Sequence, residues 1–325
     1  MAHDSRWARA PAARHPRSAG TAVRRAWRRR SRKAQVSAVA TILGLLLVVT
    51  VIANYLATTL PNTMGQNDLQ HEMLVENQVA VLSARVEATA LANAVGAPVS
   101  QPVTLGSQGA PPFADSDGGY LTALSSVTNT TGNYPRSAVN FTLLSRGVQV
   151  VFSQAGTSGF VVHLQNTYAP AAEVAYDEGA VVFAQPGGLP IFIVPPSITL
   201  SSGVLTVFLP WFTNNVNGEA GIGTADMSFR LLSTTSLTVP STTFSFVSGS
   251  HVTINITSQY AAAWYSFFLT SSSFHSYVSC TGSNLVCTKT YSPVGVAPLG
   301  TVTLSIPTSG LTLNLVTALY SVTVL

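Results

Sequence analysis

The chain has 325 residues, of which 9% are charged and 46% are hydrophobic. Because soluble globular domains carry about 25% charged residues, this composition argues against a cytosolic enzyme and favours a secreted or cell-surface β protein. The net charge of +4 is unevenly distributed, since residues 1–34 hold eleven of the sixteen basic residues and one of the twelve acidic residues. This head carries +10, and residues 35–325 together carry −6.

The basic head, residues 1–34, lies directly before an apolar segment. Lys and Arg side chains can bind nucleic acid by neutralising phosphates, but the head contains no recognisable nucleic-acid-binding fold. Basic residues beside an apolar span usually mark its cytoplasmic side. We therefore expect no nucleic-acid partner, a cytoplasmic N-terminus and an extracellular C-terminal part.

Residues 35–60 are predicted to form a single transmembrane helix. The 25 residues from Val36 to Leu60 include no charged side chain. A helix of that length covers roughly 37 Å at 1.5 Å per residue, which exceeds the hydrocarbon core of about 30 Å. Pro61 is predicted to end or kink this helix.

Two export signals fit the same region less well. A secretory signal peptide has a shorter apolar region, about 7–15 residues, followed by an A-x-A-like cleavage site. A twin-arginine signal could begin at Arg29-Arg30, but Ser31, Arg32 and Lys33 occupy positions where that signal has apolar residues.

The junction between the head and the apolar span reads Lys33-Ala34-Gln35-Val36-Ser37. This order resembles the class III signal peptide of archaeal type IV pilins and archaellins, in which a charged residue and Gly or Ala precede the cut. The resemblance implies that a membrane-embedded aspartic prepilin peptidase cleaves between Ala34 and Gln35 on the cytoplasmic side. Cleavage there would leave the apolar helix attached to the mature protein.

One position departs from the bacterial form of this signal. Bacterial type IV pilins have Glu at the fifth mature position, where this chain has Val39. Archaeal members commonly lack that Glu, so the departure favours the archaeal branch. An uncleaved signal anchor is the alternative interpretation of the same segment.

Ser37, Ala40 and Gly44 lie on one face of the predicted helix, at spacings of three and four residues. Small residues in such stripes allow transmembrane helices to approach closely. This pattern supports helix packing in a filament, although many single spans also contain small residues.

A helical stalk is predicted over residues 61–96, joined to the first helix near Pro61–Gly65. Apolar residues in it recur at intervals of four, three, four and four, which is typical of one stripe of a helix. These residues are Val75, Val79, Leu82, Val86 and Ala90. Gly96 and Pro98 are expected to stop the helix, and the stripe should pack on a β domain or on neighbouring subunits.

Residues 97–325 are predicted to form an extracellular β-rich domain. From about Val139, segments such as "HVTINITS" and "TVTLSIP" alternate apolar and polar residues, as half-buried strands do. "VAYDEGAVVFA" predicts a hairpin with Gly179 in its turn. About ten to twelve such strands favour an antiparallel sandwich. One helix should interrupt them, with Tyr260, Trp264 and Phe267 or Phe268 packed in the core.

Two kinds of covalent modification are predicted outside the membrane. Cys280 and Cys287 bracket a short loop and could form a disulfide there, although two reduced thiols are the alternative. Asn-x-Ser/Thr glycosylation sequons occur at Asn129, Asn140 and Asn255. The neighbouring apolar residues should face inward, which would turn Asn140 and Asn255 outward.

No catalytic or metal-binding motif was found. His71, His163, His251 and His275 have no metal-ligand spacing, and the chain has no G-x-S-x-G elbow, HExxH motif or P-loop. Asp115 and Asp117 hint at calcium, but the EF-hand loop is absent and a polar turn is the better interpretation. We therefore expect no enzyme activity, no cofactor and no metal.

The predicted fold class is α+β: an N-terminal transmembrane helix with a helical stalk, followed by a mainly antiparallel β-sandwich ectodomain. The resemblance implies an archaeal type IV pilin-like structural subunit or pilus-associated surface protein, located in the cell membrane or in a surface filament. Its expected partners are the membrane, a prepilin peptidase, other pilin subunits and a pilus assembly platform. The main alternative is a permanently anchored β-sandwich receptor or adhesin that does not polymerise, and a membrane-tethered glycan-processing enzyme is a third.

Overall fold

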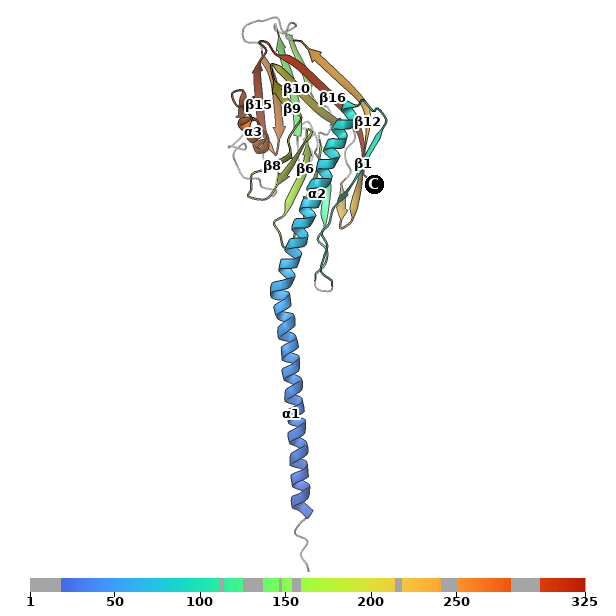
Figure 1. Ribbon diagram of the computed structural model, residues 1–325, viewed down its shortest axis with the longest axis vertical. Coiled ribbons are helices and arrows are strands. Elements are labelled where there is room, and N and C mark those ends of the chain that lie inside the picture. The colour runs from blue at the N-terminus through green and yellow to red at the C-terminus, as the bar shows by residue number, and fades with distance from the viewer. Residues whose placement is uncertain are drawn as a thin grey trace, which may run out of the picture. The chain divides into compact units, whose positions relative to one another are not determined.

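The protein is described from a computed structural model (Figure 1). The structure describes residues 19–111, 114–124, 137–145, 148–153, 159–213, 218–240, 251–281 and 299–324. For residues 19–35, 123, 137–138, 140–145, 148–153 and 281 it describes the backbone alone. The chain divides into two compact units, Met1–Thr59 and Leu60–Leu325.

The described part of the first unit is helical. Helix α1 spans Ala19–Asn54, and a π-helical turn, η1, spans Tyr55–Thr59. The sequence predicted an irregularity at Pro61–Gly65, but the structure places it just before that segment. Proline has no N–H to donate, and its ring crowds the carbonyl four residues earlier, which is that of Ala57 in η1. Pro61 follows this π-helical turn directly, as the second residue of the next helix.

The described part of the second unit contains two α-helices and sixteen strands. Helix α2 spans Leu60–Leu91 and helix α3 spans Ala261–Thr270. The strands are β1 Pro98–Thr104, β2 Gly119–Leu124, β3 Ser137–Ser145, β4 Val148–Ser153, β5 Gly159–Leu164, β6 Ala172–Asp177, β7 Ala180–Ala184, β8 Ile191–Val194, β9 Ile198–Ser201, β10 Val204–Phe212, β11 Glu219–Gly221, β12 Thr224–Val239, β13 His251–Ser258, β14 Val278–Thr281, β15 Gly300–Pro307 and β16 Thr312–Val324.

These strands form three sheets (Figure 1). The first sheet has the order β1-β12-β16-β10-β9, the second β11-β2-β5-β6-β7-β8, and the third β14-β15-β13-β3-β4. Neighbouring strands are antiparallel, except that β10 and β16 are parallel. The predicted α+β class with mainly antiparallel sheets is therefore confirmed.

The sequence predicted about ten to twelve strands, which is too few, and the strands that it missed include β1 and β2 before Val139. Strand β1 contains Pro98 and Pro102, and proline normally argues against a strand because it cannot donate a ladder hydrogen bond. In the structure β1 is an edge strand, paired with β12 alone. An edge strand tolerates proline, since one side of its backbone needs no partner.

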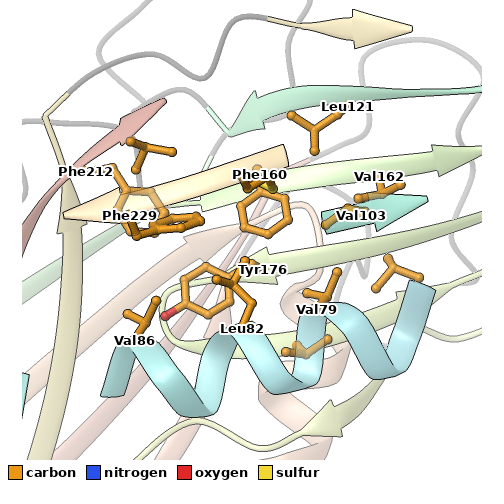
Figure 2. Close-up of a cluster of buried hydrophobic side chains, with 14 of the residues drawn as sticks. Val79, Leu82, Val86, Val103, Leu121, Phe160, Val162, Tyr176, Phe212 and Phe229 are labelled. Carbon is orange, nitrogen blue, oxygen red and sulfur yellow. The ribbon is translucent and has the colours of Figure 1, made fainter. Parts of the chain in front are cut away.

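Helix α2 packs its apolar stripe into the main core of the second unit. Val75, Val79, Leu82 and Val86 are fully buried, and Ala90 is nearly so, which confirms the stripe predicted from the sequence. Figure 2 shows α2 beside aromatic side chains from the first and second sheets, with Tyr176 above the helix. Burying one Val or Leu side chain contributes about 1.5–3 kcal/mol, so this face holds α2 on the β strands.

A second core lies between the first and third sheets and includes α3. In β13 and β15, every second residue is buried, and the intervening ones are partly exposed. Trp264 and Phe268 of α3 and the preceding Tyr260 are fully buried. The predicted alternation of these two strands and the core packing of the aromatic helix are both confirmed.

The predicted hairpin around Gly179 is also present, as β6 and β7. Its two turn residues, Glu178 and Gly179, have φ angles of 53° and 89°. Positive φ at both central residues is the requirement of a type I′ turn, and Gly meets it at no steric cost.

Candidate functional site

The apolar part of the first unit is covered by no other described part of that unit. All side chains of residues 36–59 are exposed, and the helix that includes them is long and apolar enough to cross a membrane. Such a segment in a bilayer must satisfy its own polar groups. The hydroxyls of Thr41, Thr50 and Thr58 do so by donating to backbone carbonyls four residues earlier, at 2.7–2.9 Å.

The structure places the predicted processing and packing residues on α1. Lys33, Ala34 and Gln35 have helical backbone, and nothing is described of their side chains. Ser37, Ala40 and Gly44 are exposed, and a Cβ added at Gly44 would meet no atom within 4 Å. Cleavage and helix packing at these residues stay predictions.

Helix α2 has a second, exposed face that is also partly apolar. Leu69, Met73 and Val81 are 47%, 58% and 43% exposed. They lie on the side opposite the buried stripe, where a helix that only faced water would carry polar residues. This outer face of α2, defined by Leu69, Met73 and Val81, therefore offers apolar surface to another molecule.

The early turns of α2 also bury polar side chains against two loops. Asp68 is fully buried, and its carboxylate accepts hydrogen bonds from the Ser107 hydroxyl and from the backbone N–H groups of Tyr168 and Ala169, at 2.9–3.1 Å. The Nε2–H of His71 donates to the carbonyl of Thr104 at 3.0 Å. Burial lowers the pKa of His71, although this hydrogen bond and the charge of Asp68 act in the opposite direction.

Glu72 is the most strongly perturbed of these groups. Burial and then the neighbouring charge of Glu76 raise its pKa to about 7, and a weak hydrogen bond from Gln185 acts in the opposite direction. That hydrogen bond is 3.5 Å long, and Glu72 is only 8% exposed. Its ionised form is therefore poorly stabilised in the folded protein.

A chain of polar side chains crosses three neighbouring strands of the second sheet. The Thr122 hydroxyl on β2 lies 3.2 Å from Nε2 of His163 on β5. Nδ1 of His163 lies 2.9 Å from the carboxylate of Glu173 on β6, and the same carboxylate accepts from the Tyr260 hydroxyl at 3.1 Å. Tyr120 stacks on the His163 ring, with 4.1 Å between ring centroids.

This polar chain borders a small pocket of about 190 Å³. The pocket lies at the end of β2, β5 and β6, and combines polar groups with apolar walls. It is lined by Tyr120, His163, Leu164, Gln165, Ala171, Ala172, Glu173 and Pro186.

The sequence did not predict this arrangement, because its residues are far apart in the chain and meet only where the strands pair. His163 and Glu173 belong to adjacent strands and face each other in register, as do Tyr120 and His163. One available signal was the carboxylate of Glu173, which directly precedes the hydrophobic residues Val174, Ala175 and Tyr176 in one strand. Among the described residues, no three His, Cys, Asp or Glu side chains form a group that could hold a metal ion.

A second buried polar cluster holds α3 on the second sheet. The carboxylate of Asp177, at the end of β6, accepts hydrogen bonds from the Ser258 hydroxyl and the Trp264 indole at 2.8 and 2.9 Å. All three side chains are fully buried. These bonds fix the helix that directly follows Tyr260, the residue that also contacts Glu173.

The remaining predicted residues lie in several places. Cys280 is on β14, whereas Cys287 and Asn129 lie outside the described residues, so the disulfide and that glycosylation site stay predictions. Asn140 lies on β3, and its side chain is not described. Asn255 on β13 is partly exposed, and its side-chain oxygen accepts a hydrogen bond from Thr303 at 2.8 Å.

The loop proposed as a polar turn makes a defined contact. The carboxylate of Asp117 accepts hydrogen bonds from both the backbone N–H and the hydroxyl of Thr167, at 2.8 and 2.6 Å. Asp117 thus ties the loop before β2 to the loop after β5.

No protein-family model, no curated protein and no solved structure matches this chain.

Proposed function

We propose that the protein is an archaeal type IV pilin-like surface subunit. The observation that carries this proposal is an N-terminal helix that is uncharged, mainly apolar and exposed over residues 36–59. The chain continues into a β-rich unit packed on α2. A helix that is apolar on every side is unstable in water and needs lipid or other helices around it. A pilin-like subunit provides both environments, first the membrane and then the filament core.

The outer face of α2 supports assembly rather than simple anchoring. Its inner stripe is buried in its own β strands, yet Leu69, Met73 and Val81 remain exposed on the other side. Contiguous exposed apolar surface is typical of protein–protein contact sites, and these three side chains follow one side of the helix at intervals of four and eight residues. In a filament, neighbouring subunits would cover it.

The sequence supplies the processing and the topology. The basic head holds the N-terminus in the cytoplasm, a prepilin peptidase removes residues 1–34, and the β-rich unit lies outside the cell. The mature protein is a structural subunit or pilus-associated protein that works with other pilin subunits and an assembly platform, without enzyme activity of its own.

The alternative is a β-sandwich receptor or adhesin that stays anchored and does not polymerise. The pocket beside His163 and Glu173 favours a ligand-binding role of this kind and is compatible with either form. The two proposals differ in whether the N-terminal helix is processed and leaves the bilayer.

The experiment that tests the proposal is mass spectrometry of the native N-terminus. We expect the mature protein to begin at Gln35, and we expect Lys33→Glu or Ala34→Leu to leave a larger, unprocessed form. Lys33→Arg is the matched control, because it keeps the positive charge and should be processed normally. An intact basic head in the mature membrane pool would contradict the pilin-like function and favour the permanent anchor.

A further inference from the structure

The pocket in the second sheet contains a buried charged group that stability alone does not explain. Along the same face of this sheet, Leu124, Val161, Ala175 and Val182 are fully buried apolar residues. Glu173 is also buried, at 6% exposed. Taking a carboxylate and an imidazole out of water is costly, and well-packed apolar residues of similar volume are often as stable or more so. Their presence beside a pocket therefore points to a binding role.

The groups around the pocket are held in fixed positions before any ligand arrives. His163 is oriented at both ring nitrogens, by Thr122 and by Glu173. Its ring in turn orients Tyr120 through the stacking contact. Glu173 is held from the other side by Tyr260, which directly precedes α3. Fixed groups of this kind lose little conformational entropy when a ligand binds.

The size of the pocket limits the ligand to about one ring. Pockets that hold drug-sized molecules have volumes of roughly 300–1,000 Å³, whereas this pocket has about 190 Å³. Its walls are partly apolar and include the exposed residues Ala171 and Pro186. A ligand must therefore combine a compact, partly apolar body with polar groups.

The polar groups at the pocket select the chemistry of that ligand. The hydroxyl of Tyr120 and the side-chain amide of Gln165 can both donate and accept hydrogen bonds. Neither group has a hydrogen-bond partner among the described residues. The carboxylate of Glu173 repels anions. This carboxylate already accepts one hydrogen bond from Tyr260 and lies 2.9 Å from Nδ1 of His163, so it does not require a cation. Hydroxyl groups match this set, because each can donate and accept.

We propose that this pocket binds one neutral monosaccharide ring, with the sugar hydroxyls on Tyr120, Gln165 and Glu173 and the carbon face of the ring against the apolar wall. Such a site would let the β-rich unit recognise glycans on a surface. The site goes beyond the pilin-like function and does not rest on it, since it involves only residues of the second unit.

Saturation-transfer NMR on the full chain in lipid nanodiscs tests this site. The probes are glucose, galactose, mannose and N-acetylglucosamine, with ethylammonium as the cationic comparison. We expect saturable binding of at least one sugar, and at least tenfold weaker binding in Tyr120→Phe and in Glu173→Gln. Tyr120→Phe keeps the ring that stacks on His163 and removes only the hydroxyl, so the fold should persist.

Asp226→Asn is the matched control, because it removes an exposed carboxylate on β12 and should leave sugar binding unchanged. A thermal melt of each variant separates lost binding from lost folding. The proposal is overturned if no sugar binds saturably, if only ethylammonium binds, or if both pocket variants bind sugar as the wild type does. None of these outcomes changes the N-terminal processing result, so the two proposals can fail separately.

Discussion

Single residues of α2 show how the fold changes the chemistry of side chains that look ordinary in the sequence. Asp68, His71 and Glu72 lie within five positions of each other, and all three are buried. Asp68 has three hydrogen-bond donors around it, whereas Glu72 has one weak donor and a nearby carboxylate. Asp68 therefore has donors for both of its carboxylate oxygens, whereas the ionised form of Glu72 is poorly stabilised.

The Glu72→Gln substitution should stabilise the protein at pH values above about 7. The pKa of Glu72 is raised from 4.5 to about 7 in the folded protein, so between these values the folded state holds a proton that the unfolded state has lost. Stability from this group therefore falls as the pH rises through that window. The variant has no carboxylate to ionise and should escape this loss.

Thermal melts at pH 4 and pH 8 measure this effect. The melting temperature of Glu72→Gln should match the wild type at pH 4 and exceed it at pH 8. Asp226→Asn is the control, since its carboxylate is exposed. His71 acts in the opposite direction, because its lowered pKa removes stability as the pH falls below about 6.5. If the melting temperatures of Glu72→Gln and the wild type differ by the same amount at pH 4 and pH 8, the raised pKa of Glu72 is contradicted.

At the scale of elements, α2 is a helix with two different apolar surfaces. One surface is the stripe buried against β strands, and the other is the outer face of Leu69, Met73 and Val81. The first belongs to the fold of the second unit, and the second is available to partners. A substitution can therefore separate folding from assembly on the same helix.

Leu82→Ala should lower the free energy of unfolding by about 2–5 kcal/mol, the usual cost of removing a buried leucine side chain. Leu82 is fully buried and lies among the core residues shown in Figure 2. The matched control is Leu69→Ala on the outer face, which should change stability by less than about 0.5 kcal/mol. Denaturant unfolding, followed by tryptophan fluorescence, measures the free energy of unfolding of both variants. If Leu82→Ala and Leu69→Ala lose the same amount, the buried and outer faces of α2 do not differ in their contribution to stability.

At the scale of the whole molecule, the two units differ in whether their apolar residues are buried within the unit. The second unit buries its own apolar residues in cores between sheets and helices. In the first unit, all of residues 36–59 are exposed. Under the proposed function, its surroundings are first lipid and then other copies of the chain.

Gly44→Leu should prevent filament assembly and leave membrane insertion intact. Close packing of transmembrane helices depends on small residues, and a leucine at Gly44 would project from the Ser37/Ala40/Gly44 face while making the span more apolar. Ala53→Leu is the matched control, because at 100° per residue it lies on the opposite side of the helix. Shearing of cells that express each form measures assembly, and sheared filaments that contain Gly44→Leu would contradict the predicted packing face.

Local patterns in the sequence predicted the parts of this fold that depend on local geometry. The stripe from Val75 to Ala90 follows the helical repeat, and the alternation in β13 and β15 follows the repeat of a strand. The β6–β7 turn needs only a residue that tolerates positive φ. In each case the residues that decide the structure are close neighbours in the chain.

Tertiary structure alone decided which distant residues meet. The last strand, β16, lies inside the first sheet between β12 and β10, a pairing that no local repeat encodes. The pocket likewise requires Tyr120, His163 and Glu173 to come into register across three strands. Strand register depends on long-range packing of the buried face. The sequence by itself therefore determined an apolar N-terminal span and an amphipathic helix before a β domain, whereas the candidate ligand site exists only because the sheets bring these side chains together.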